Sequence, residues 1–251
     1  MEVHAHSSPA PGGAHTARKK WTHYFWEFFM LFLAVFCGFL AEYQLEHKIE
    51  KQREKKFMQL LAQDLQSDFD SIARIKVHRL ERYNQADSLL LSLLNGDYKT
   101  NGSNVYYWGR YISRRRFFYS ADGTLQQLKN SGSLRLIHKK DIVQKIIAYD
   151  VVYRNYIRQL EVEMVLVEQY RNTAAGIFNA AYFQRVVPYD FANRPEGNPQ
   201  LFDSSPAVVN ELANKINYLM GGQYRLTQLL DGLSEKAKEL MELIKKEYHF
   251  K

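Results

Sequence analysis

A run of apolar and aromatic residues constrains this chain more than any other feature: it extends from Trp21 to Tyr43 and reads WTHYFWEFFMLFLAVFCGFLAEY. Its inner part, residues 28–41, carries no charge and no strongly hydrogen-bonding side chain. A helix needs about 20 mostly apolar residues to cross a bilayer, and the run reaches that length with its aromatic flanks. We therefore expect residues 21–44 to form a transmembrane helix in contact with membrane lipid.

Amphipathic aromatic side chains border this span, as they do where headgroups meet hydrocarbon; they are Trp21, Tyr24, Trp26 and Tyr43. Glu27 is costly inside hydrocarbon, but it lies one helical turn from the edge, where it can reach water or take up a proton. A cleaved signal peptide would be shorter and would end in a small-x-small site. Phe36 is too bulky for lipoprotein cleavage before Cys37, so we interpret that cysteine as a packing residue in a retained anchor.

Basic residues on both sides of the span bear on its orientation. Arg18, Lys19 and Lys20 directly precede it, and five more basic residues follow it between positions 48 and 56. A compact basic cluster before a first span usually stays inside the cell, and long domains translocate largely regardless of charge. We expect the N-terminus inside and the C-terminal domain outside the cytoplasm.

Composition limits what lies outside the span. The remainder of the 251 residues is long enough for one domain with a real core. The net charge of +7 is spread along the chain without a basic block, which argues against nucleic acid as a partner. Residues 1–20 are rich in Ala, Ser, Pro, Gly and His and are predicted to be a disordered tail, so His4, His6 and His15 are not expected to hold a metal.

The rest of the chain shows helical periodicity and predicts an all-α fold, in which the transmembrane helix continues into a bundle of long antiparallel helices over residues 45–251. The first bundle helix is expected to bury Phe57, Leu61, Leu65, Phe69, Ile72, Ile75, Leu80, Tyr83, Leu90 and Leu94 and to end at Asn95-Gly96. A second helix is predicted over residues 140–178 and buried on two sides. A third begins at Ser205-Pro206 and stops at Gly221-Gly222, and a fourth covers residues 224–248.

Two long aromatic loops are predicted between these helices, at residues 95–119 and 180–205. The first combines aromatic rings with guanidinium groups, a mixture that suits an anionic glycan, a lipid headgroup or an acidic protein surface. Its candidate partner-binding residues are Tyr107, Trp108, Tyr111, Arg114, Arg115, Arg116 and Phe117. In the alternative interpretation, the loop folds its aromatic rings under the bundle and leaves three arginines in water.

Two stretches carry a family resemblance. After the span comes EKQREKKFMQLLAQDLQSD, with Leu60, Leu61, Asp64 and Leu65 in a Leu-x-x-Asp-Leu pattern, and residues 124–149 read TLQQLKNSGSLRLIHKKDIVQKIIAY. The second stretch has a Leu-x-x-Ser-Gly-x-Leu-x-Leu-Ile segment and an Ile-x-x-Tyr helix, in which the matching residues are Leu128, Ser131, Gly132, Leu134, Leu136, Ile137, Ile146 and Tyr149. Over residues 24–150 the chain thus resembles a family of uncharacterised bacterial single-span membrane proteins.

This resemblance implies an anchored helical domain in a bacterial inner membrane, with that domain in the periplasm, and it implies no activity. The chain departs from the family by its longer N-terminus and by His138, Lys139 and Lys140, which replace the Asn and Arg common there. Asp122-Gly123-Thr124 indicates a turn and helix cap, and Ser131-Gly132 a left-handed helix stop. We expect a small structural wedge here, with a ligand site as the alternative.

A search for reactive constellations indicates no catalytic residue, no cofactor site and no metal site. Asp64, Asp68 and Asp70 are expected on a solvated face, His78 and His138 are isolated, and Glu161 and Glu163 point apart on their helix. We therefore expect a membrane-anchored interaction or scaffold protein, not an enzyme, that acts as a subunit of a cell-envelope complex and binds a protein partner or a second copy of itself. The alternative is an extracytoplasmic sensor-like domain that binds a small ligand between its helices.

Overall fold

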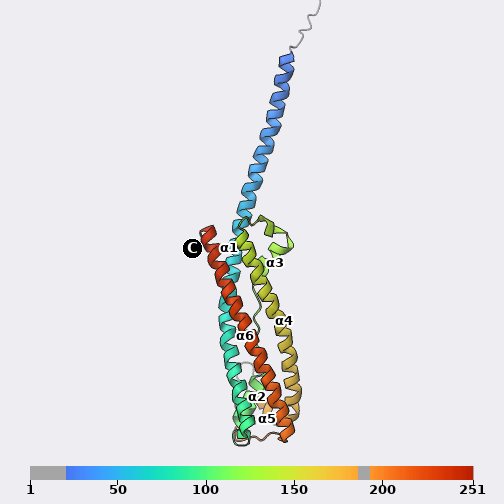
Figure 1. Cartoon of the computed structure of the whole chain (residues 1–251), viewed down its shortest axis with the longest axis vertical. Coiled ribbons are helices and arrows are strands. Elements are labelled where there is room, and N and C mark those ends of the chain that lie inside the picture. The colour runs from blue at the N-terminus through green and yellow to red at the C-terminus, as the bar shows by residue number, and fades with distance from the viewer. Residues whose placement is uncertain (1–20, 186–192, 251) are drawn as a thin grey trace, which may run out of the picture. The chain divides into compact units, whose positions relative to one another are not determined.

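A computed structural model describes residues 21–185 and 193–250, so the predicted tail at 1–20 and the loop residues Pro188, Tyr189 and Phe191 lie outside the described part. Its regular elements are all helical, which confirms the all-α prediction for the described residues (Figure 1). In order they are α1 (Trp21–Asn95), η1 (Asp97–Lys99), α2 (Gly102–Tyr111), α3 (Gly123–Asn130), η2 (Ser133–Leu136), α4 (Lys140–Ile177), α5 (Ala180–Arg185) and α6 (Pro206–Tyr248).

The chain divides into two compact units, residues 1–52 and residues 53–251. The first unit contains the apolar run, which is helical throughout and long enough to cross a membrane, with none of its apolar window buried. The expected interface residues Trp21, Tyr24, Trp26 and Tyr43 are all exposed. His23 lies beside Glu27, with 3.2 Å between Nε2 and Oε1, so this carboxylate has a polar neighbour one turn away.

The second unit is a bundle of α1 from residue 53 onward, α4 and α6 (Figure 1). Contacts of α1 with α4 and the residues just before it have residue numbers that rise together on both sides. They run from Glu54–His138 through Asp68–Tyr149 to Arg82–Glu163. Contacts from α1 to α6 run in opposite directions, from Glu54–Tyr248 to Lys76–Asp231. The bundle is therefore not antiparallel throughout: α6 opposes the other two, whereas α1 and α4 are parallel, because residues 96–139 return along the bundle before α4 begins.

Buried side chains recur every seven residues along each long helix. In α1 they are Met58, Leu65, Ile72, Arg79, Ala86 and Leu93; in α4, Ile142, Tyr149, Tyr156, Glu163, Tyr170 and Ile177; in α6, Leu212, Leu219, Leu226, Leu233 and Leu240. Two turns of helix take close to seven residues, so such a repeat keeps one stripe of each helix facing its neighbours over many turns. This repeat, more than any local signal, determines what is buried.

The observed repeat shows that the burial predicted for parts of α1 and α4 is wrong. Leu80, Tyr83 and Leu94 are exposed, because the expected stripe on α1 took a five-residue step after Ile75. The buried face continues instead through Arg79 and Arg82. On the second apolar side predicted for α4, Ile147, Val151 and Val165 are exposed, whereas Val143 and Val152 are half-buried and pack against the core. The covered side chains of α4 face α1, α6 and the segment between α2 and α4, where Phe118 packs with Tyr156.

The predicted break at Gly221-Gly222 is also wrong, since α6 is one helix from Pro206 to Tyr248, with Ser205 at its N-cap as expected. Glycine weakens a helix by about 1 kcal/mol relative to alanine but does not forbid it. Gly222 is buried against α4, where a Cβ atom would come within 3.1 Å of Leu166 Cδ1. Tertiary packing on both sides of the pair therefore outweighs the local signal.

The two predicted loops contain helices. Residues 102–111 form α2 and residues 180–185 form α5, and their aromatic rings pack together: Tyr106 lies edge-on to Phe178 and Phe183, which stack on each other. The core has two apolar clusters, and on α1 the first contains buried residues between Met58 and Ile72 and the second those between Ala86 and Leu93. The short helices belong to the second cluster, with the ends of α1 and α4 and the start of α6, which explains why they are ordered. Further along, Gly132 adopts a left-handed φ of 66°, as its Ser-Gly pattern predicted.

Candidate functional site

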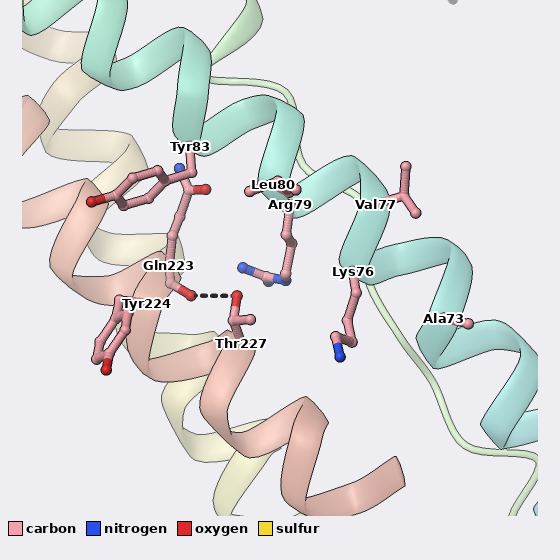
Figure 2. A pocket seen from close by; sticks show the side chains of 9 residues that line it. All are labelled: Ala73, Lys76, Val77, Arg79, Leu80, Tyr83, Gln223, Tyr224 and Thr227. Atoms are coloured by element: carbon pink, nitrogen blue, oxygen red, sulfur yellow. Dashed lines mark hydrogen bonds between the residues drawn. The ribbon is translucent and has the colours of Figure 1, made fainter.

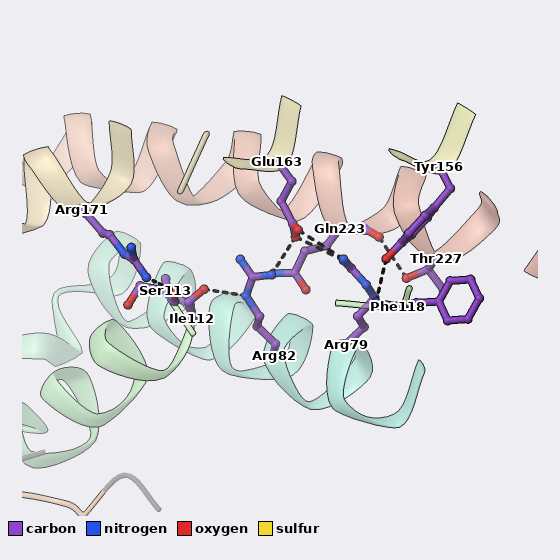
Figure 3. A network of polar contacts seen from close by, with 10 residues as sticks. All are labelled: Arg79, Arg82, Ile112, Ser113, Phe118, Tyr156, Glu163, Arg171, Gln223 and Thr227. Carbon is purple, nitrogen blue, oxygen red and sulfur yellow. Dashed lines mark hydrogen bonds and ion pairs between the residues drawn. The ribbon is translucent and has the colours of Figure 1, made fainter. Parts of the chain in front are cut away.

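A layer of charged and polar side chains crosses the middle of the bundle and separates its two apolar clusters (Figure 3). Glu163 on α4 is fully buried and faces two arginines of α1. Arg82 donates from Nη1 to Glu163 Oε1 over 2.7 Å, and Arg79 donates to both carboxylate oxygens over 3.2 Å. Arg79, Arg82, Glu163 and Gln223 of α6 occupy core positions of the seven-residue repeat, and we call them the polar layer.

Charge attraction keeps Glu163 ionised. Burial raises the pKa of a carboxyl group, but the positive charges of Arg82 and Arg79 outweigh that effect and hold the pKa of Glu163 below its ordinary value of 4.5. Two buried guanidinium groups thus face one buried carboxylate. The polar layer carries one excess positive charge.

The polar layer and neighbouring side chains of α4 also hold the segment that follows α2. Arg82 donates from Nε to the backbone oxygen of Ile112 over 2.6 Å, and Arg171 of α4 donates to the backbone oxygen of Ser113 over 2.7 Å. Phe118 donates its backbone N–H to the hydroxyl of Tyr156 on α4. Residues 112–118 are therefore fastened to the bundle by side chains, although they have no regular structure of their own.

Several polar atoms of the layer have no hydrogen-bond partner among the described residues. They are the donors Arg79 Nε, Arg82 Nη2 and Gln223 Nε2, and the acceptor Gln223 Oε1. The side chain of Gln223 is 1% exposed, so these atoms are removed from bulk solvent. Buried polar atoms are nearly always paired in native proteins, and a surplus of donors indicates a place for an acceptor.

An open groove of 630 Å³ lies beside the layer, between α1 and α6 (Figure 2). Arg79 and Gln223 line it, together with Ala73, Lys76, Val77, Leu80, Tyr83, Tyr224 and Thr227. Val77, Leu80 and Tyr224 are each more than half exposed, so the groove walls are apolar surfaces that no described residue covers. Lys76 forms an ion pair with Asp231 and so joins the two helices at the groove.

A second polar centre lies nearer the start of the bundle, around Asp68. Asp68 accepts hydrogen bonds from the hydroxyls of Ser120 and Tyr149 and, over 2.7 Å, from the backbone N–H of Ala121. Burial raises the pKa of Asp68, and the hydrogen bonds from Ser120 and Tyr149 act against that rise. The prediction of a solvated face is therefore wrong for Asp68, which is buried because it fastens the segment before α3.

Neighbouring acidic residues take similar structural roles. Asp64 accepts from the backbone N–H of Thr124, in the first turn of α3, over 3.2 Å, so α1 supplies a partner for an otherwise unpaired donor. Glu54 is buried and accepts from the backbone of His138 and from the hydroxyl of Tyr248. His138 Nδ1 also lies 3.0 Å from Glu54, so His138 is not isolated as the sequence suggested.

The predicted partner-binding residues lie on α2 and the segment after it. Tyr107 and Tyr111 stack at 5.8 Å, Tyr107 lies under the guanidinium of Arg194, and the Tyr111 hydroxyl donates to Glu81. Trp108 is half-buried in the second apolar cluster, and Arg115 stacks on Phe117 at 4.9 Å. Arg114 is half-buried and Arg116 is exposed. Several of these residues thus also have structural contacts within the bundle.

Arg116 and Phe117 line a hollow of 330 Å³ against α1. Arg74 and Tyr119 contribute to the same hollow, and the ring of Tyr119 is 67% exposed. Two arginines beside exposed aromatic edges form a surface that suits a carboxylate-bearing partner.

Sequence reasoning missed the buried charged residues of α1, one of which belongs to the polar layer, although a signal for them was present. Glu54, Asp68 and Arg82 follow one another at intervals of 14 residues, so all three fall on the same position of the seven-residue repeat. Charged residues at regular core positions indicate buried ionic contacts. In the described residues no group of three His, Cys, Asp or Glu side chains is placed to hold a metal ion. Comparisons with protein-family models, curated proteins and solved structures found no match.

Proposed function

We propose that the protein is a membrane-anchored interaction protein, a subunit of a cell-envelope complex, whose helical bundle binds an acidic surface of a partner protein. The observation that carries this proposal is the hollow lined by Arg74, Arg116, Phe117 and Tyr119, where two guanidinium groups lie beside aromatic side chains. The apolar run of α1 supplies the anchor. A second copy of the chain is the other partner that such a surface could take.

The proposed location is the cytoplasmic membrane of a bacterium, crossed once, with the bundle in the periplasm. The basic cluster at Arg18, Lys19 and Lys20 supports an N-terminus inside the cell. A single cysteine at the exposed position Lys99, in a Cys37→Ala background, would be labelled in intact cells by a maleimide that crosses the outer membrane but not the inner one. Labelling only after lysis would contradict this orientation.

The partner can be tested by photo-crosslinking in intact cells. A photoreactive amino acid at Tyr119, beside the hollow, is expected to capture one stoichiometric protein. The same amino acid at Tyr218 is a matched control, because both rings are 67% exposed and Tyr218 lies on α6, outside the hollow. Arg116→Glu should abolish capture from position 119 by reversing the charge that attracts the acidic surface.

The adducts distinguish the outcomes. A heteromeric adduct that depends on Arg116 supports the proposed complex, and an adduct between two copies assigns the surface to a homo-oligomer. Equal adducts at both positions, or capture that survives Arg116→Glu, would contradict binding at the hollow.

A further inference from the structure

The groove between α1 and α6 has a property that partner binding at the hollow does not use. Its walls are apolar, but its floor is formed by Arg79 and Gln223, which are 2% and 1% exposed. Figure 2 shows both side chains between the two helices, with Leu80 on α1 and Tyr224 on α6 among the other lining residues. A site with these two parts fits a molecule that has an apolar body and a polar end.

The polar layer indicates the charge of that end. Arg79 and Arg82 carry two positive charges against the single negative charge of Glu163, and three donors against one acceptor have no partner among the described residues. A carboxylate supplies one negative charge and acceptor oxygens only. It would balance the charge of the layer and accept from Arg79 Nε and Gln223 Nε2, the two unpaired donors whose side chains line the groove.

The size and shape of the groove indicate what kind of apolar body the ligand would have. Sites that bury small molecules measure about 300–1,000 Å³, and the groove has 630 Å³. Its apolar side chains lie along consecutive turns of α1, at Ala73, Val77, Leu80 and Tyr83, so they form a wall that follows the helix. A flexible hydrocarbon chain can lie along such a wall, and it would cover the exposed surfaces of Val77 and Leu80.

We propose that this groove binds a long-chain fatty acid, with its carboxylate at Arg79 and Gln223 and its chain along Val77, Leu80 and Tyr224. Fatty acids partition into membranes, and the bundle is joined by α1 to the candidate span, so the ligand would be available where the protein is anchored. The proposal gives a specific site to the ligand-binding alternative and is independent of the partner surface at Arg116.

Photo-labelling of the full chain in phosphatidylcholine nanodiscs tests the site. The probe is palmitic acid with a diazirine near the end of its chain, and the labelled peptides are mapped by mass spectrometry. Within the bundle, label is expected on peptides that contain residues 73–83 and 224–227. Excess oleic acid should remove this label, whereas oleyl alcohol, which has the same chain and no charge, should not.

Competition with phosphatidylglycerol distinguishes a free fatty acid from an anionic phospholipid, since both combine a hydrocarbon chain with a negative charge. Failure of phosphatidylglycerol to compete supports a free fatty acid, and competition equal to that of oleic acid would overturn this choice in favour of an anionic phospholipid. Equal competition by oleyl alcohol would overturn the role of the polar layer. Absence of label from both groove peptides would overturn the site.

A pair of variants tests the groove without disturbing the core. Leu80→Glu places a carboxylate on the groove wall and should lower labelling about tenfold, because it repels the anionic end and interrupts the apolar wall. Leu94→Glu is the matched control: Leu80 is 63% exposed and Leu94 is 64% exposed on the same helix, and Leu94 does not line the groove. Unchanged labelling in Leu80→Glu, with helix content preserved by circular dichroism, would overturn the proposal.

Two further variants separate this inference from partner binding. Gln223→Leu removes the amide but keeps a side chain of similar length, so it should weaken labelling without opening a cavity. Arg116→Glu should leave labelling unchanged, because Arg116 lines the hollow and not the groove. Loss of labelling in Arg116→Glu would contradict two separate sites.

Discussion

Arg82 Nη1 lies 2.7 Å from Glu163 Oε1, between two helices that otherwise bury mostly apolar side chains against each other. The same arginine donates from Nε to the backbone oxygen of Ile112. One charged side chain of α1 therefore connects α4 with the segment after α2. Buried charges of this kind contribute little net stability when paired, but they become costly when one partner is removed.

Glu163→Gln should destabilise the bundle by about 3–5 kcal/mol, because Arg79 and Arg82 would remain buried without a counter-charge. The measurement is chemical denaturation of the full chain in detergent, followed by circular dichroism. Glu161→Gln is the control, since Glu161 lies two residues away on the exposed side of α4 and should change stability by less than about 0.5 kcal/mol. Similar effects of the two substitutions would mean that the polar layer is not closed in solution.

The stability difference between the wild type and Glu163→Gln should depend on pH. A carboxyl group whose folded-state pKa lies below its unfolded value stabilises the fold above the unfolded value and loses that contribution as the pH falls through the folded one. For Glu163 the difference should be full above its ordinary pKa of 4.5 and shrink below it. Denaturation of both proteins between neutral pH and pH 3 measures this, and a constant difference would refute it.

Asp68 titrates in the opposite sense, because burial raises its pKa above the ordinary value of 3.8. Its contribution to stability is present below that value and decreases as the pH rises through the folded-state pKa. Both proteins in the preceding comparison contain Asp68, so its contribution cancels in their difference.

Tyr149→Phe should cost about 1–3 kcal/mol, because it leaves a buried carboxylate with one donor fewer. The hydroxyl of Tyr149 donates to Asp68 Oδ2, and the ring is buried in the first apolar cluster, so the substitution removes a hydrogen bond without removing packing. Thermal unfolding gives the effect. Tyr218→Phe, on an exposed ring of α6, should leave the midpoint unchanged.

Alanine substitutions at Gly221 and Gly222 should differ, although the two residues are adjacent in α6. A Cβ atom at Gly221 meets no atom within 4 Å, so Gly221→Ala should stabilise the helix by up to about 1 kcal/mol. A Cβ atom at Gly222 comes within 3.1 Å of Leu166 Cδ1, which must move, so Gly222→Ala should gain less or nothing. Destabilisation by Gly221→Ala would favour the helix break that the sequence pattern suggested.

Local sequence signals correctly predicted several helix ends and one turn, because these depend on a few neighbouring residues. Ser205-Pro206 starts α6, Gly132 adopts the left-handed conformation, and α4 begins at Lys140 and ends within one residue of its expected end. The polar layer is different, because Arg82 and Glu163 are 81 residues apart in the chain and charged residues seldom occupy core positions. A periodicity analysis that considers only apolar residues does not detect Arg82 and Glu163.

For the candidate sites too, the sequence showed local character but not the contacts between residues that are distant in the chain. The aromatic and basic character of residues 106–119 was evident from the sequence, but which of these side chains pack inward was not. Tyr106 and Phe118 are buried, whereas Arg116 and Tyr119 remain on the surface. The groove could not be predicted, because it depends on α6 continuing through Gly221-Gly222 and on the alignment of that helix with α1.

The seven-residue repeat leaves each long helix with several alignments that are nearly alike, and the polar layer distinguishes among them. If α4 slid by one repeat relative to α1, Tyr156 or Tyr170 would take the place of Glu163 opposite Arg79 and Arg82. The apolar layers would still match, but two guanidinium groups would be enclosed without an anion. A polar residue at one core position specifies the pairing of helices in this way. The layer that interrupts the core therefore favours one alignment of α1 with α4 over its neighbours.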